Sequence, residues 1–283
     1  MGNTISKIRQ FRILELFSGT HSVGVVSHEM GMEVHSLDMI LPATSPFKAD
    51  YKSAVHYQMP LDEFQYKKFK PGHFDIVWAS PVCAIWSHLK KSWLGRSAKS
   101  IRPDGGPVRM EDIERQINEV GKPMVDRCFD IIEYLKPQVW FLENPQNSLM
   151  KHYIAERWSK YNTFYDLDYC AYNNFGYRKR TRFWTNLQNY KAKRCAGKGK
   201  CPSMLTEEEA PGRSIHRITI GCKNHESQTE HTTRWERYRV PYNIMRDFFK
   251  HAISNGQLKY NFTPKAPTKK ITLIQKKTWE VQW

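Results

Sequence analysis

Roughly the first 190 residues alternate between strand-like and helix-like segments, and this alternation constrains the fold more than any other feature of the chain. The short apolar runs that read as strands are residues 12–17, 33–39, 74–79 and 139–142. Apolar residues at helical spacing lie between them, first from Val23 to Met30 and again from Met124 to Leu135. Such alternation is typical of a mostly parallel sheet with helices on both faces, so we predict an α/β fold.

The pattern changes twice along the chain. Residues 87–121 are rich in Lys and Arg and contain a Pro-Asp-Gly-Gly turn but show little periodicity, so we expect a long functional loop. After residue 186 Lys, Cys, Gly and Pro replace the apolar pattern, which indicates a smaller unit over 187–236. We expect residues 1–186 to form one large domain, 237–256 a helix that returns to it, and 257–283 a basic arm.

The charge balance indicates a polyanionic partner. The chain has 44 Lys and Arg against 28 Asp and Glu, a net charge of +16, and 13% of its residues are aromatic. Aromatic rings stack on bases, so nucleic acid is the favoured partner and an acidic protein is the alternative.

The sequence contains no apolar run long enough for a membrane span and no secretory signal. We expect a monomer inside the cell, in the cytoplasm or, in a eukaryotic host, in the nucleus or a viral factory. Residues 1–6 also fit an N-myristoylation pattern at Gly2, for which a chance match is the alternative.

Polar and small residues follow each predicted strand. In parallel sheets, ligands bind at the carboxyl ends of the strands, so these residues are candidates for a site. They are Phe17-Ser18-Gly19-Thr20, Asp38-Met39, Ser80-Pro81-Val82-Cys83 and Glu143-Asn144-Pro145. A small-residue turn that enters a helix, followed by an acid at the end of the second strand, predicts a nucleoside cofactor site.

Cys83 is a candidate nucleophile. It lies in a Pro-containing turn ahead of a basic loop, and a positive neighbourhood lowers the pKa of a thiol. The alternative is a buried, inert thiol. Glu143 at the end of the next strand favours the catalytic interpretation, because attack on a pyrimidine needs a nucleophile and an acid beside the ring nitrogen.

Five ordered motifs between residues 11 and 187 resemble those of the DNA cytosine-5 methyltransferase family. LFSGTHSVG (16–24) is similar to its Phe-x-Gly-x-Gly segment, and acids follow at Asp38 and Asp50. ASPVCAIWS (79–87) is similar to its Pro-Cys loop, and LENPQNS (142–148) to its Glu-Asn-Val motif. FGYRKRTRFW (175–184) is similar to its Gln-x-Arg-x-Arg motif. The short chain and the Glu-Asn-Pro form are most similar to compact viral and phage members.

The resemblance implies a Rossmann-like methyltransferase fold with a small recognition insert, S-adenosylmethionine as methyl donor and double-stranded DNA as partner. The implied catalytic residues are Cys83, Glu143, Arg180 and Arg182. The implied cofactor-binding residues are Phe17, Ser18, Gly19, Thr20, His21, Ser22, Asp38, Met39, Asp50 and Pro81. The implied DNA-binding residues are Ser87, Lys90, Lys91, Arg96 and Arg178.

The reaction implied by the resemblance begins when the enzyme flips a cytosine out of the duplex. The Cys83 thiolate adds to C6 while Glu143 hydrogen-bonds to N3 and the exocyclic amine. C5 then takes the methyl group, and loss of its proton expels Cys83. Arg180 is expected to orient Glu143 and the base, and Arg182 to brace the site or bind phosphate.

The chain departs from the family pattern at Val82, where the family has Pro, and at Arg178, where it has Gln. The closing Gly-Asn motif is not recognisable. Two alternatives stay open: a transfer-RNA cytosine-5 methyltransferase, because one branch of the family modifies transfer RNA with the same residues, and a catalytically silent DNA-binding relative, to which Val82 points.

Four soft ligands in the 187–236 segment predict a structural zinc site. They are Cys195, Cys201, Cys222 and His225, with His216 as a competing ligand. Such a segment has little core of its own and gains order from a bound metal. Free thiols are the alternative.

Overall fold

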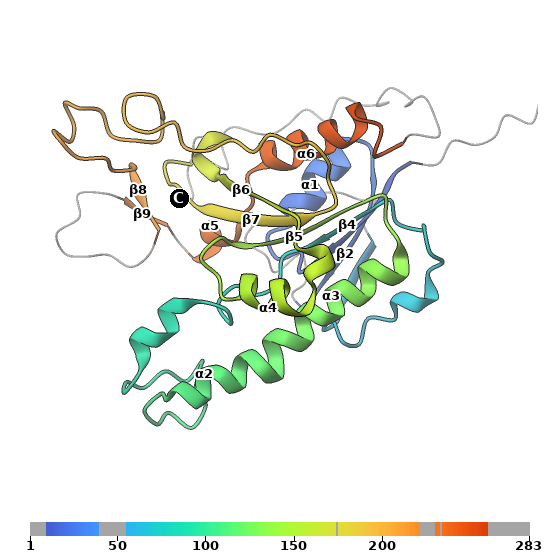
Figure 1. Ribbon diagram of the computed structural model, residues 1–283, viewed down its shortest axis with the longest axis horizontal. Coiled ribbons are helices and arrows are strands. Elements are labelled where there is room, and N and C mark those ends of the chain that lie inside the picture. The colour runs from blue at the N-terminus through green and yellow to red at the C-terminus, as the bar shows by residue number, and fades with distance from the viewer. Residues whose placement is uncertain (1–9, 40–54, 174, 221–229, 233, 260–283) are drawn as a thin grey trace, which may run out of the picture.

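The computed structural model describes residues 10–39, 55–173, 175–220, 230–232 and 234–259. They form an α/β fold around a seven-stranded sheet in the order β3-β2-β1-β4-β5-β7-β6, which confirms the predicted class (Figure 1). The strands are β1 (Arg12–Leu16), β2 (Glu33–Asp38), β3 (Val55–Gln58), β4 (Ile76–Ala79), β5 (Val139–Pro145), β6 (Phe164–Asp168) and β7 (Arg180–Thr185).

The strands β1 to β5 pair in parallel, and β7 runs antiparallel to both β5 and β6. The central strands are apolar on both faces because helices cover both sides. The strand order reverses between β1 and β4, and the carboxyl ends of strands beside such a reversal leave a crevice for ligands.

Helices cover both faces of the sheet (Figure 1). One face carries α1 (Ser22–Glu29) and α6 (Tyr242–Ser254), and the other carries α3 (Lys122–Leu135) and α4 (Met150–Arg157). The expected helix over 237–256 is shorter than predicted, because Pro241 lies directly before α6 and separates it from α5 (Arg234–Tyr238).

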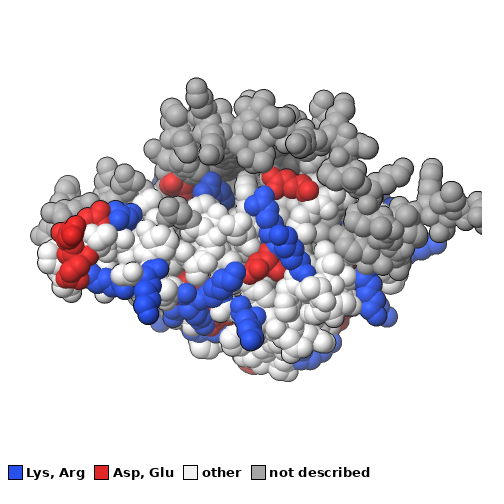
Figure 2. Space-filling view, turned by 90° about the horizontal axis from the view of Figure 1, so that it is seen from above, with Lys and Arg blue, Asp and Glu red and all other residues white. Residues whose placement is uncertain are grey.

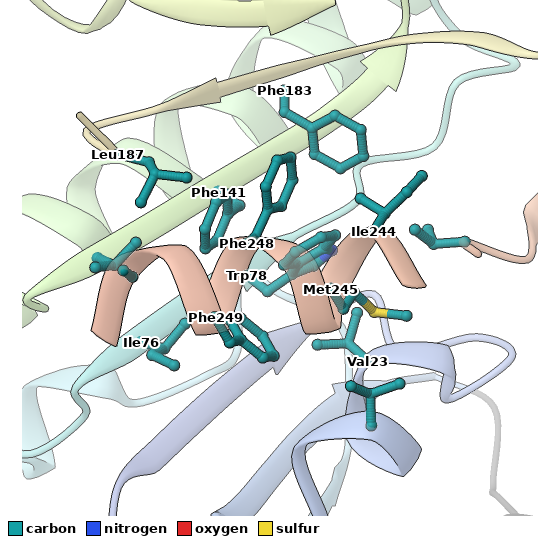
Figure 3. Close-up of a cluster of buried hydrophobic side chains, with 14 of the residues drawn as sticks. Val23, Ile76, Trp78, Phe141, Phe183, Leu187, Ile244, Met245, Phe248 and Phe249 are labelled. Carbon is teal, nitrogen blue, oxygen red and sulfur yellow. The ribbon is translucent and has the colours of Figure 1, made fainter. Parts of the chain in front are cut away.

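Aromatic side chains join α6 to the sheet (Figure 3). Phe248 stacks on Phe141 of β5 with ring centroids 4.9 Å apart, and Trp78 of β4 lies 5.0 Å from the same ring. Each such side chain stabilises the fold by about 1.5–3 kcal/mol through burial. The C-terminal helix is therefore part of the same core as β1 to β5.

The expectation of an unstructured loop over 87–121 is wrong in part. The 3₁₀ segment η3 (His88–Trp93), α2 (Met110–Gln116) and the π-helical turn η4 (Ile117–Gly121) lie there, and η4 continues directly into α3. Their small core is Ile101, Val108 and Ile113. Periodicity missed α2 because five of its seven side chains are polar, so it has no apolar stripe.

The segment that follows β7 is largely irregular. Within residues 186–220, the two-residue strand β8 (Ile218–Thr219) is the one helix or strand of the described chain. It pairs with β9 (Glu230–His231). The boundaries 187–236 and 257–283 stay predictions. No helix within the described ranges has the length and apolarity that a membrane crossing requires.

Candidate active site

The turn between β1 and α1 has an unusual backbone. Phe17, Gly19 and His21 all have left-handed φ angles, of 60°, 37° and 54°. The backbone N–H of Gly19 donates to Oδ2 of Asp38 at 2.9 Å, which ties the turn to the end of β2. The small-residue turn after β1 and the acid at the end of β2, which the sequence predicts to bind a nucleoside cofactor, therefore meet at the carboxyl edge of the sheet.

The hydroxyls of this turn differ in their pairing. Thr20 Oγ1 and Ser22 Oγ lie 2.8 Å apart and satisfy each other. Ser18 Oγ is buried and has no hydrogen-bond partner within the described part of the chain. A buried hydroxyl without a partner costs stability unless a ligand satisfies it, so this atom suits a polar group of a nucleoside cofactor. Met39 is 67% exposed beside Asp38.

Glu15 and His21 are buried ionisable groups beside the turn. Glu15 accepts a hydrogen bond from Gly24 N at 3.1 Å, and burial raises the pKa of its carboxyl to about 8. Burial, with the charge of His56, lowers the pKa of His21 to about 4. Both side chains are therefore neutral near pH 7. Glu15 was not predicted as a site residue, since one acid in an apolar strand gives no distinct signal.

Cys83 and Glu143 lie in one electrostatic neighbourhood. Burial raises the pKa of the Cys83 thiol; the Lys179 ammonium opposes this rise, and the Glu143 carboxylate adds to it. Lys179 Nζ lies 3.7 Å from Glu143 Oε1. Cys83 therefore lies within electrostatic range of Glu143 and of Lys179, a lysine that the sequence did not single out.

A second unpredicted residue contacts Glu143. The hydroxyl of Tyr169 donates to Glu143 Oε1 at 3.4 Å, and burial raises the pKa of Tyr169 so that it keeps its proton. Lys179 stands inside a recognised motif and could have been found from its position between two arginines. Tyr169 has no such signal, because only the packing of η6 (Tyr169–Ala171) brings it to β5.

The loop that carries Cys83 is held by its own hydrogen bonds. Asn144 Nδ2 donates to the carbonyl of the buried Pro81 at 2.9 Å, and Trp86 N donates to the carbonyl of Cys83 at 3.1 Å. Val82 is 42% exposed and replaces the family proline. Hydrogen bonds on both sides of Val82 therefore hold the turn.

The expected orientation of Arg180 and Arg182 is wrong. In the antiparallel register Glu143 lies opposite Phe183, whereas Asn144 lies opposite Arg182. Successive side chains point to opposite faces of a sheet, so both arginines lie on the face away from Glu143. Arg180 forms two 2.9 Å hydrogen bonds with Asp168. Lys179, not Arg180, is the cation beside Glu143.

Arg182 is largely buried and cannot bind phosphate in this arrangement. Its guanidinium donates to both carboxylate oxygens of Asp166, at 2.6 and 2.9 Å, and lies 3.5 Å from the centroid of the Phe164 ring. Arg182 therefore braces β7 against β6.

The predicted DNA-binding residues divide by exposure. Lys91, Arg96 and Arg178 are exposed, and Ser87 caps η3 by accepting a hydrogen bond from Leu89 N. Lys90 does not fit the prediction, because it is buried and its ammonium donates to Gln116 of α2. Figure 2 shows Lys and Arg side chains spread over one face of the molecule, with acidic side chains gathered at its left edge and in smaller groups among the basic ones.

Of the predicted zinc ligands, Cys195 and Cys201 lie together. Cys222, His225 and the predicted cofactor ligand Asp50 lie outside the described residues. Two other residues complete the cluster around the first pair: Cys170 and His216.

The chain is similar to a curated protein of Frog virus 3 (isolate Goorha), named "Probable DNA (cytosine-5)-methyltransferase". The two are 37% identical over 232 residues, which cover 81% of this chain and 94% of the viral protein. No protein-family model matches the chain.

Solved structures of methyltransferases match more distantly. The Entamoeba histolytica methyltransferase EhMeth is 20% identical, with a TM-score of 0.42, over 65% of this chain and 57% of that chain. A variant of Spodoptera frugiperda DNMT2 is 15% identical, with a TM-score of 0.40, over 65% of this chain and 53% of that chain. The chain spans about half the length of these structures.

Proposed function

Because the chain belongs to the DNA (cytosine-5)-methyltransferase family, we propose that it transfers a methyl group from S-adenosylmethionine to carbon 5 of cytosine in double-stranded DNA. The observation that carries this proposal is the proximity of Cys83, Glu143 and Lys179 at the carboxyl edge of the sheet. A thiol, a carboxyl group and a cation are what addition to C6 of a pyrimidine requires.

The residues of the chain divide the work on the base. The cytosine leaves the duplex and enters the site. Cys83 attacks C6 as the thiolate, while Glu143 in its protonated form donates a proton to N3 and accepts a hydrogen bond from the exocyclic amine. Lys179 favours the Cys83 thiolate, and Tyr169 holds Glu143 in place. The enamine carbon C5 takes the methyl group. Water then removes the C5 proton, the ring double bond re-forms, the Cys83 sulfur leaves as the thiolate, and N3 returns its proton to Glu143.

The cofactor fits the β1–α1 turn. S-adenosylmethionine supplies an electrophilic methyl group. Asp38 accepts hydrogen bonds from the ribose hydroxyls in this proposal, which its bond to Gly19 N at the turn supports. The buried Ser18 Oγ gives the cofactor one more polar contact.

A covalent trap tests the proposal. Duplex DNA that contains 5-fluorocytosine should form a denaturation-resistant adduct with the protein in the presence of S-adenosylmethionine, because fluorine at C5 blocks the final elimination. Cys83→Ala should abolish the adduct, whereas Cys128→Ala, at a core thiol of α3, should retain it. Absence of the adduct with the unaltered protein would refute catalysis. An adduct with 5-fluorocytosine transfer RNA but not with DNA would move the substrate to RNA.

A further inference from the structure

Four metal-ligating side chains converge beside the end of β6. They are Cys170, Cys195, Cys201 and His216, and one ligand atom from each lies within 4.8 Å of the others. Cys170 lies in η6, the 3₁₀ turn that directly follows β6 of the main sheet. The other three ligands come from the irregular segment after β7. Residues far apart in the sequence thus meet at one point.

The separations suit a tetrahedral metal. Cys195 Sγ lies 3.5 Å and Cys201 Sγ lies 3.8 Å from His216 Nε2. Zinc bonds of about 2.3 Å to sulfur and about 2.0 Å to nitrogen put tetrahedral S and N ligands about 3.6 Å apart. The backbone bridge between Met204 and His216 fixes the position of the histidine.

Among the described residues, the apolar cluster at this site is small. Cys170 and Cys201 are buried, and Met204 is the one other buried apolar residue in this cluster. Three thiols and one imidazole are a soft ligand set that favours zinc over magnesium or calcium.

We propose that Cys170, Cys195, Cys201 and His216 bind one structural zinc ion, which attaches the segment after β7 to the catalytic sheet. This set retains Cys195 and Cys201 from the sequence-based prediction and replaces Cys222 and His225. All four ligands lie among the described residues, and none belongs to the proposed reaction.

The site lies next to the catalytic strands. Cys195 N donates to Asp168 Oδ2 at 2.9 Å, and the two oxygens of Asp168 also hold Arg180 of β7. The zinc ion thereby positions Arg180 through Asp168, as well as the basic segment that precedes β8.

Metal analysis of variants tests the site. The full-length protein, purified without a histidine tag from zinc-supplemented cells, should contain one zinc per chain by plasma mass spectrometry. Cys170→Ser and His216→Ala should each contain less than half as much. Cys128→Ala changes a buried cysteine outside the cluster and should retain full zinc, and His216→Cys should retain zinc through four sulfur ligands.

The proposal is overturned if the unaltered protein contains well under one zinc per chain, or if Cys170→Ser and His216→Ala keep full zinc. His216→Cys guards against variants that simply fail to fold, because it substitutes the same position and restores a ligand. Chelation of the unaltered protein should also speed proteolytic cleavage within residues 191–217 and leave the core around α6 protected; unchanged cleavage would contradict the structural role. None of these readouts depends on methyl transfer.

Discussion

The charges around Cys83 govern its reactivity at the scale of single residues. Burial and Glu143 both raise the pKa of the thiol, whereas Lys179 is the first of the groups that lower it. Methyl transfer should therefore accelerate as the pH rises toward the pKa of Cys83, because only the thiolate attacks.

Replacement of Lys179 should move this dependence. Lys179→Met removes the opposing charge, so the pKa of Cys83 rises further and the pH profile of single-turnover methyl transfer shifts toward higher pH. A rise of one unit in the pKa of Cys83 reduces the thiolate fraction, and so the rate of methyl transfer, ~10-fold at pH 7. Lys179→Arg keeps the charge and should keep the profile. An identical profile for Lys179→Met would mean that the lysine does not act on the thiol.

Glu15 should make stability depend on pH. Burial raises the pKa of Glu15 from an ordinary value of 4.5 to about 8 in the folded protein. Between pH 4.5 and pH 8, Glu15 is therefore protonated in the folded protein and ionised in the unfolded chain. The free energy of unfolding should then fall as the pH rises from about 5 to 8, by at most about 1.4 kcal/mol per unit.

Glu15→Gln cannot ionise and keeps an acceptor for Gly24 N. Urea unfolding at pH 5, 7 and 9 should show a weaker decline for this variant than for the unaltered protein. Parallel declines would show that Glu15 does not carry the effect.

At the scale of elements, the π-helical turn η4 supports the catalytic loop. A Cβ at Gly121 would lie 2.9 Å from Ile85 Cγ2 and 3.0 Å from the Trp86 ring, and both residues follow Cys83 in the loop. These neighbours are buried and cannot move freely. The helix α2–η4–α3 and the loop therefore fit together only with glycine at this position.

Gly121→Ala should displace the loop and cost about 1–3 kcal/mol of stability through overpacking. It should also lower kcat, while S-adenosylmethionine binding at the β1–α1 turn, which neither Ile85 nor Trp86 belongs to, persists. The exposed Asn118→Ala in the same turn is the matched control and should change neither. Thermal unfolding and steady-state kinetics measure the two effects, and full activity of Gly121→Ala would refute the close fit.

At the scale of the whole molecule, the net charge of +16 should make DNA binding strongly salt-dependent. Each lysine or arginine that neutralises a phosphate contributes about −0.9 to the slope of log affinity against log salt. Exposure distinguishes the lysines and arginines that are predicted to contact phosphates. Lys91 and Arg96 are exposed, whereas Lys90 is buried and donates a hydrogen bond to Gln116.

The double substitution Lys91→Ala, Arg96→Ala should reduce the magnitude of the slope by about 2. Lys90→Met should leave the slope unchanged, since a buried lysine contacts no phosphate. Fluorescence anisotropy over a range of salt concentrations measures both. A reduced slope for Lys90→Met would mean that the loop rearranges on DNA.

The sequence by itself determined the α/β class and the positions of the main candidate residues. Buried parallel strands are continuous apolar runs, so their ends could be located, and the residues just past them are local in the sequence. This is why the turn after Phe17, Asp38, Cys83 and Glu143 were found. Lys179 also lay within a recognised motif.

Only the tertiary structure decided which side chains meet. The register of β7 places Arg180 and Arg182 on the face away from Glu143, and a shift of one residue would reverse that result. The packing of η3 against α2 buries Lys90, and the fold of the segment after β7 brings Cys170 and His216 to Cys195. These outcomes depend on contacts between segments far apart in the chain, which local patterns of polarity do not encode.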